Sequence, residues 1–183
     1  MSIVRNELLT VADSNKLDSL PKSYLAVKST ASYSPVSQDE AAATIFTDIE
    51  KDEIDPVGWA IEPSMGAVRN VSGRNLVGNF GVVSMQLVST NNAIKTLFTF
   101  SEISTDNGAT WVINQGSGRE EALKSNAITY PSKASQGFNI PNDALARFRV
   151  FTSGAGISID PIAFTGGGVA ITGPSFRWWF MEA

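Results

Sequence analysis

The chain has 183 residues, enough for one domain with a substantial core, and its formal net charge is −4. It contains neither cysteine nor histidine, which excludes disulfides, thiolate metal sites and Ser-His-Asp or Cys-His nucleophiles. The 14 basic residues are scattered along the chain, so they do not form the concentrated positive surface that nucleic acid requires. No long apolar run predicts a membrane span, and the opening sequence MSIVRNELLTVADSNK lacks the pattern of a signal peptide.

Residues 1–55 differ from the rest of the chain because their apolar residues are irregularly spaced. The sequence predicts an N-terminal arm here, containing a short helix over 37–49. Ser37 is its predicted cap, Glu40 lies three residues further on, and Pro56 ends any helix at or before Asp55. Several acidic residues follow the predicted helix, but they lack the spacing of a calcium-binding loop, so we interpret them as a solvated helix end.

From residue 56 onward the pattern changes to short apolar segments separated by Gly, Asn, Ser and Pro. This texture predicts about eight antiparallel strands and no helices. The expected strand segments are 57–63, 76–89, 94–104, 109–114, 127–131, 137–141, 146–154, 157–165 and 169–183. An all-β fold with an antiparallel jelly-roll sandwich over 56–183 fits this spacing better than an α/β fold does.

One turn carries a specific motif, S-x-D-x-G-x-T-W, which is the "Asp box" found in sialidases and other β-proteins. Its residues are Ser104, Asp106, Gly108 and Trp111. The Asp carboxylate can bond nearby backbone N–H groups, the glycine supplies a positive φ, and the tryptophan packs behind the hairpin. We therefore predict a structural turn. A sialidase propeller would need several boxes, a longer chain and an arginine cluster.

The final predicted strand is apolar on both faces. By the two-residue period of a strand, Phe176, Trp178 and Phe180 lie on one face, and Trp179 and Met181 on the other. The sequence leaves two interpretations open, a simple core strand or a strand with one face in an oligomer interface. Aromatic enrichment favours the interface. We predict that Phe176, Trp178, Trp179 and Phe180 contact another copy of the chain.

The remaining charged and glycine-rich features have structural interpretations. Arg147, Arg149 and Arg177 are expected to form polar rungs with Glu102, Glu120 or Glu182 on neighbouring strands. Adjacent Glu120 and Glu121 point to opposite sides of a strand, which argues against a glycosidase acid pair. The Gly-rich run 166–168 lacks the following Lys-Ser/Thr of a phosphate-binding loop and is expected to be a turn.

With these segments in view, residues 57–183 resemble the C1q/TNF-like jelly rolls found in many phage virion proteins. The resemblance rests on the S-x-D-x-G-x-T-W hairpin, on ARFRVFTSG followed by GISIDPIAF, and on the aromatic final strand. It implies a homotrimer whose final strands lie near the threefold axis. It also implies a capsid decoration protein or a fibre tip, with no enzymatic activity and no cofactor.

The N-terminal arm has neither a heptad shaft nor a collagen-like repeat, which a fibre would normally need. We therefore predict a trimeric capsid decoration (cement) protein that stabilises a bacteriophage head, assembled in the host cytoplasm and located in the virion. Residues 1–55 would dock on the major capsid protein, and neither nucleic acid nor a membrane is expected as a partner. The alternative is a receptor- or carbohydrate-binding tail or fibre tip, using Trp59, Trp111 and Tyr130. A sialidase-type hydrolase is a third, weaker hypothesis.

Overall fold

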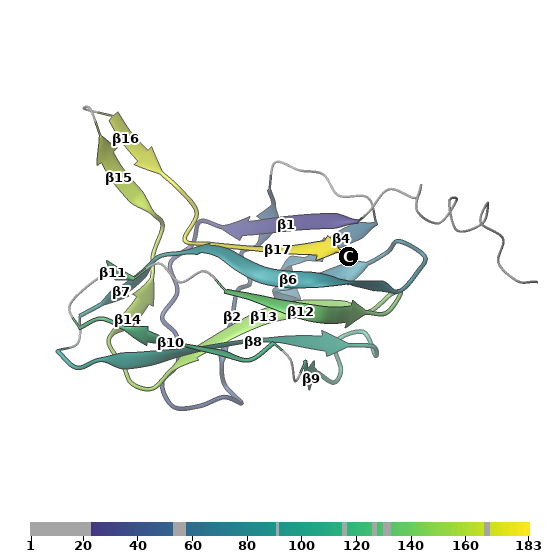
Figure 1. Ribbon diagram of the computed structural model, residues 1–183, viewed down its shortest axis with the longest axis horizontal. Coiled ribbons are helices and arrows are strands. Elements are labelled where there is room, and N and C mark those ends of the chain that lie inside the picture. Colours follow the sequence, from purple (N-terminus) through teal and green to yellow (C-terminus); the bar gives the residue numbers. More distant parts are fainter. Residues whose placement is uncertain are drawn as a thin grey trace, which may run out of the picture.

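A computed structural model of the chain describes residues 23–52, 58–90, 92–114, 117–125, 128–129, 133–166 and 169–183. Within these ranges almost all regular structure is β, and two antiparallel sheets form the body of the molecule (Figure 1). The exception is a short 3-10 turn at Pro63–Met65. The predicted all-β class is confirmed.

The first sheet has the strand order β12-β6-β17-β1-β3. Its strands are β12 (Lys133–Ile140), β6 (Leu76–Met85), β17 (Phe176–Glu182), β1 (Tyr24–Ser29) and β3 (Glu50–Lys51). Every pairing between them is antiparallel. The aromatic strand β17 is therefore central, and it is hydrogen-bonded to β1 on one side and to β6 on the other.

The second sheet has the strand order β10-β8-β13-β5-β4. Its strands are β10 (Arg119–Leu123), β8 (Lys95–Ser104), β13 (Leu145–Thr152), β5 (Ala67–Asn70) and β4 (Trp59–Glu62). Two short strands pair with interior strands of this sheet, β2 (Thr44–Ile45) with β13 and β9 (Val112–Ile113) with β8.

Two smaller sheets complete the described structure. One contains β11 (Ile128–Thr129), β7 (Leu87–Ser89) and β14 (Ile157–Ile159), in that order. The other is the hairpin of β15 (Ala163–Gly166) and β16 (Val169–Thr172), which stands away from the body of the sandwich (Figure 1).

The connections between the two large sheets define a jelly roll. Its eight main strands in chain order are β1, β5, β6, β8, β10, β12, β13 and β17. One sheet contains β1, β6, β12 and β17, and the other contains β5, β8, β10 and β13. The chain thus crosses repeatedly between sheets, as two nested Greek keys require.

The core lies between the two sheets and follows the strand period. Leu25 and Val27 of β1 face inward beside Phe176, Trp178 and Phe180 of β17, and all five side chains are fully or almost fully buried. From the other sheet, β13 contributes every second residue. Apolar residues at alternate positions explain why these segments form strands, since each strand thereby places one apolar face in the core.

The helix predicted over 37–49 is not formed. β2 lies inside this range, and Phe46 packs in the core with its ring stacked on that of Phe176 at 3.9 Å. The carbonyl groups of Ala41 and Ala43 accept hydrogen bonds from the Arg149 guanidinium, so they are not used in helical i→i+4 bonds. Tertiary contacts have overridden a local capping pattern here.

The predicted boundary at residue 55 also differs from the structure. β1, β2 and β3 all precede it, yet each pairs with a strand of the sandwich. The jelly roll therefore begins by Tyr24, and the part of the predicted arm before Ser23 lies outside the described residues.

Candidate functional site

The outer face of the first sheet is the main candidate for an interaction surface. Along β17, the residues that alternate with the core residues are Arg177, Trp179 and Met181. Their register partners on β1 are Lys28, Ala26 and Tyr24 respectively. This face therefore combines a charged end with an apolar end.

The apolar end is partly exposed in the single chain. Met181 is 47% exposed and Val77 on β6 is 49% exposed, while Trp179 and Tyr24 are half-buried. Trp179 lies between two buried small residues, Ala26 on β1 and Gly81 on β6. We call Tyr24, Val77, Trp179 and Met181 the outer patch.

The charged end is organised around Asp52, whose side chain is largely buried. Its carboxylate lies 2.7 Å from the Nε of Arg177 and 3.6 Å from the Nζ of Lys28. The Arg177 contact has ion-pair distance but not hydrogen-bond geometry at Nε. Because Lys28 and Arg177 face each other across the strands, Asp52 offsets a repulsion between like charges. The outer patch thus has a polar border, as protein interfaces commonly do.

The structure separates the four residues predicted to form an oligomer interface. Phe176, Trp178 and Phe180 fill the core of their own chain and have no accessible surface for a partner. Trp179 is the member of this set that reaches the outer face. The sequence pattern had already divided these residues between two faces, but it did not show which face was internal.

The S-x-D-x-G-x-T-W turn is held by a compact set of hydrogen bonds. Ser104 donates its hydroxyl to Asp106 Oδ1 at 2.8 Å and accepts the backbone N–H of Gly108 at 2.8 Å. Asp106 also accepts the backbone N–H and the hydroxyl of Thr110, at 2.8 and 2.5 Å. Gly108 has a φ of +88°, and its carbonyl accepts the indole N–H of Trp111 at 3.1 Å. All polar groups of the motif are used to hold the turn.

These hydrogen bonds affect the acidity of Asp106. Donation from the side chain and backbone of Thr110, and then from Ser104, lowers the pKa of its carboxyl to about 2. Hydrogen bonds to the ionised form stabilise that form and so favour loss of the proton. The carboxylate therefore has a structural task, which is to accept the hydrogen bonds that hold the turn.

Behind this turn lies a buried group of three charges. Glu102 accepts hydrogen bonds from Arg147 at 2.7 Å and from Arg149 at 2.9 Å, and all three residues are buried. Arg147 also lies over the Trp111 ring, 3.7 Å from its centroid. Burial lowers the pKa of the Arg147 guanidinium, while its hydrogen bond to Glu102 opposes the shift. We call Glu102, Arg147 and Arg149 the buried triad.

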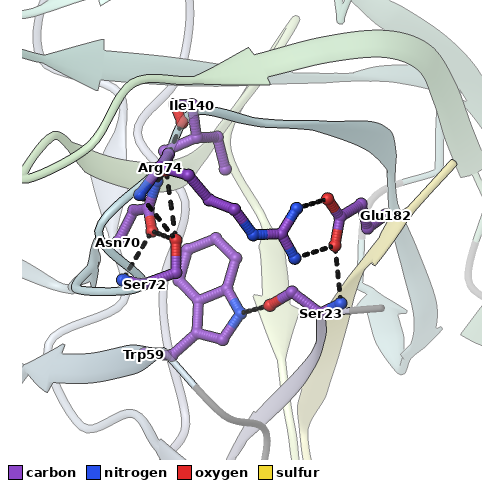
Figure 2. Close-up of polar contacts among 7 residues, drawn as sticks. All are labelled: Ser23, Trp59, Asn70, Ser72, Arg74, Ile140 and Glu182. Carbon is purple, nitrogen blue, oxygen red and sulfur yellow. Dashed lines mark hydrogen bonds and ion pairs between the residues drawn. The ribbon is translucent and has the colours of Figure 1, made fainter. Parts of the chain in front are cut away.

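Arg177 and Glu182 were also predicted to form ion pairs, and each is paired with a residue that was not predicted. Arg177 pairs with Asp52, and Glu182 pairs with Arg74 through both carboxylate oxygens. Glu182 Oε2 also accepts the backbone N–H of Ser23 at 2.7 Å, and the Ser23 hydroxyl accepts the indole N–H of Trp59 at 2.6 Å (Figure 2). This group joins β17, the residue before β1, β4 and the loop before β6.

Asn70 extends the same network and was not identified from the sequence. Its amide donates to the carbonyls of Arg74 and Ile140, and its Oδ1 accepts from the N–H and hydroxyl of Ser72 (Figure 2). The amide also donates to the carbonyl of Pro141. A fully buried Asn with this many partners fixes the loop between β5 and β6. The acceptors Ile140 and Pro141 are 70 and 71 positions away in the chain, so no local sequence signal marks these two contacts.

Two of the three aromatic residues proposed for carbohydrate binding can be located. Trp59 is buried in the core, and Trp111 is half-buried with Arg147 over its ring. Tyr130 lies outside the described residues. The structure therefore does not present Trp59 and Trp111 together as an exposed stacking platform.

Across the described ranges, no group of three or more carboxylate, His or Cys side chains is placed to hold a metal ion. The same ranges contain no helix of the length and hydropathy needed to cross a bilayer. No family model matches the sequence, and no curated protein matches it at a significant level.

Asp106 provides a test of the turn by pH titration. We expect its carboxyl to titrate near pH 2 in carbon-detected NMR. Because the folded-state pKa is depressed, the stabilisation is present above the unfolded pKa of about 4 and is lost as the pH falls toward 2. Wild type should therefore be more stable than Asp106→Asn at neutral pH, and this difference should shrink on acidification. Titration at the ordinary aspartate value would contradict the hydrogen-bonding scheme.

We predict that one conservative substitution in the buried triad lowers the stability of the protein strongly. Glu102→Gln removes the negative charge between two buried guanidinium groups, so we expect the free energy of unfolding to fall by about 3 kcal/mol. Urea denaturation followed by circular dichroism measures the change. The matched control is Glu120→Gln on the neighbouring strand, which is exposed and should change stability by no more than about 0.5 kcal/mol. Equal effects of the two changes would rule out a special role for Glu102.

Proposed function

We propose that this protein is a viral structural protein, a homotrimeric capsid decoration (cement) protein that stabilises a bacteriophage head. The observation that carries the proposal is the outer patch, an exposed apolar surface on the central strands of one jelly-roll sheet. An apolar surface in the middle of a sheet, bordered by charged residues, is typical of a face that another protein covers.

A second copy of the chain is the partner that best suits this surface. The outer patch is uncharged, so it offers no electrostatic reason to select a different partner. Its position on β17 also agrees with the trimers implied by the C1q/TNF-like resemblance, in which the final strands lie near the threefold axis. Trp179 and Met181 would then be the principal contact residues.

The motif residues support a structural role. Ser104, Asp106 and Trp111 direct their polar groups into the turn itself, and the three buried charges satisfy one another. The sequence lacks His and Cys, so nucleophiles and metal sites that depend on an imidazole or a thiolate have no residues to form them. We further propose that the part of the chain preceding β1 docks on the major capsid protein.

The oligomer can be tested by a charge placed in the outer patch. Met181→Asp should convert trimers to monomers in analytical ultracentrifugation at micromolar concentration, because burying an unpaired carboxylate in an apolar interface is unfavourable. Ile94→Asp is the matched control, since Ile94 is 72% exposed on a loop outside the patch and its variant should remain trimeric. Both variants should keep the wild-type circular dichroism spectrum. A wild-type protein that stays monomeric would overturn the proposal.

Deleting β17 is not a useful alternative to this substitution. The strand pairs with both β1 and β6 and supplies Phe176, Trp178 and Phe180 to the core. Its removal would unfold the chain whether or not it forms an interface. The location on a virion can be tested separately by the copy number in purified particles. A number comparable to that of the major capsid protein supports decoration, and a few copies would contradict it.

A further inference from the structure

A cavity on the second sheet, remote from the outer patch, has features of a ligand site. It has a volume of about 450 Å³, within the usual range for small-molecule pockets. Phe98, Phe100 and Phe151 contribute its aromatic lining, and Glu40 and Glu120 contribute carboxylates. The rings come from the adjacent strands β8 and β13, on the face of the sheet that points away from the core.

The three rings present faces in more than one direction. Phe98 and Phe151 are stacked, with centroids 4.6 Å apart and planes 11° apart. Phe100 meets Phe151 edge-on at an angle of 69°. Phe98 and Phe151 remain half-buried, so part of their surface is accessible from the cavity. The accessible part of a ring face carries negative π potential, which attracts a cation.

The charges around the cavity favour a positive ligand. Both of its charged lining residues, Glu40 and Glu120, are acidic and exposed. Arg149 lies beneath Phe100, with its guanidinium 5.7 Å from the ring centroid, but it does not line the cavity. Its N–H groups bond Glu102 and the carbonyls of Ala41 and Ala43. The two arginines and one glutamate of the buried triad carry a net charge of +1, but the N–H groups of Arg149 bond these acceptors and Arg149 is not among the residues that line the cavity.

We propose that this cavity binds an organic cation, an alkylammonium group that is either quaternary or the primary ammonium of a lysine side chain. The methylene or methyl groups of such a ligand would contact the rings, and its charge would be stabilised by the ring faces and by Glu40 and Glu120. An anion would be repelled by the two carboxylates. The charges of the two carboxylates would not strengthen the binding of a neutral ligand. This proposal does not depend on the oligomer or on the virion assignment.

The test compares a cation with a neutral molecule of the same shape. Choline and its uncharged analogue 3,3-dimethyl-1-butanol should be titrated into the full chain and followed by ¹⁵N NMR. We expect shifts at the backbone N–H groups of Phe98, Phe151 and Glu120, with the neutral analogue binding about fivefold or more weakly. Equal affinity for choline and its neutral analogue would overturn the proposal.

Two variants test the role of the carboxylates. The double variant Glu40→Gln plus Glu120→Gln should weaken choline binding about fivefold or more and leave binding of the neutral analogue unchanged. Glu121→Gln, compared with Glu120→Gln alone, is the control for net charge, because each change removes one negative charge and Glu121 is next to Glu120 in the same strand but does not line the cavity. Glu121→Gln should retain most of the choline affinity. Weakening by Glu121→Gln as large as that by Glu120→Gln alone would show that only overall charge matters.

A third titration distinguishes the two sources of the ammonium group. N-acetyl-lysine methylamide represents a lysine of a protein partner, and choline represents a free quaternary ammonium compound. Tighter binding of the lysine derivative would assign the cavity to a protein partner, and tighter binding of choline would assign it to a small molecule. Both results support a cation site, and failure of both ligands to bind would reject it.

Discussion

The structure depends above all on the position of β17 between β1 and β6. Its inward residues Phe176, Trp178 and Phe180 fill the core, while its backbone completes the hydrogen bonds of two neighbours. Beyond the strand pairs, the contacts of Glu182 with Arg74 and Ser23 hold the end of this strand against the loops around it. An outward face with an exposed apolar surface is a consequence of this central position, because the second side of the strand is not covered by the other sheet.

The second sheet has a different organisation, because much of its outer face is occupied by side chains that contact loops of the same chain. The buried triad connects β8 and β13 to the loop at Ala41 and Ala43, and Arg147 carries the connection to Trp111. Burying three charges costs desolvation energy, and the close pairing offsets this cost without making the group more stabilising than apolar packing would be. Its specific contribution is geometric, since it fixes the loop and the Asp-containing turn relative to the same two strands.

The sequence predicted the fold better than it predicted the contacts. Short apolar segments between Gly-rich breaks and turn residues identified β8, β13 and β17, and the S-x-D-x-G-x-T-W motif identified the turn at Asp106. The prediction of a helix over 37–49 was wrong because it rested on a local capping pattern. This segment is instead held by long-range contacts of Phe46 and Arg149. The predicted strand over 169–183 is split between β16 and β17 around Gly173 and Pro174, where proline cannot donate to a sheet. The pairing of β1 with β17, which defines the outer patch, leaves no trace in either segment alone.

That pairing also constrains how the molecule reaches its native state. Ser23 and Glu182 are 159 positions apart in the chain but are hydrogen-bonded to each other. During synthesis β1 leaves the ribosome long before β17 has been translated. Its apolar residues Leu25 and Val27 therefore remain without the strand beside which they pack. Closure of the sandwich is consequently a late, non-local event, and the nascent chain is most vulnerable to aggregation in the interval before β17 arrives.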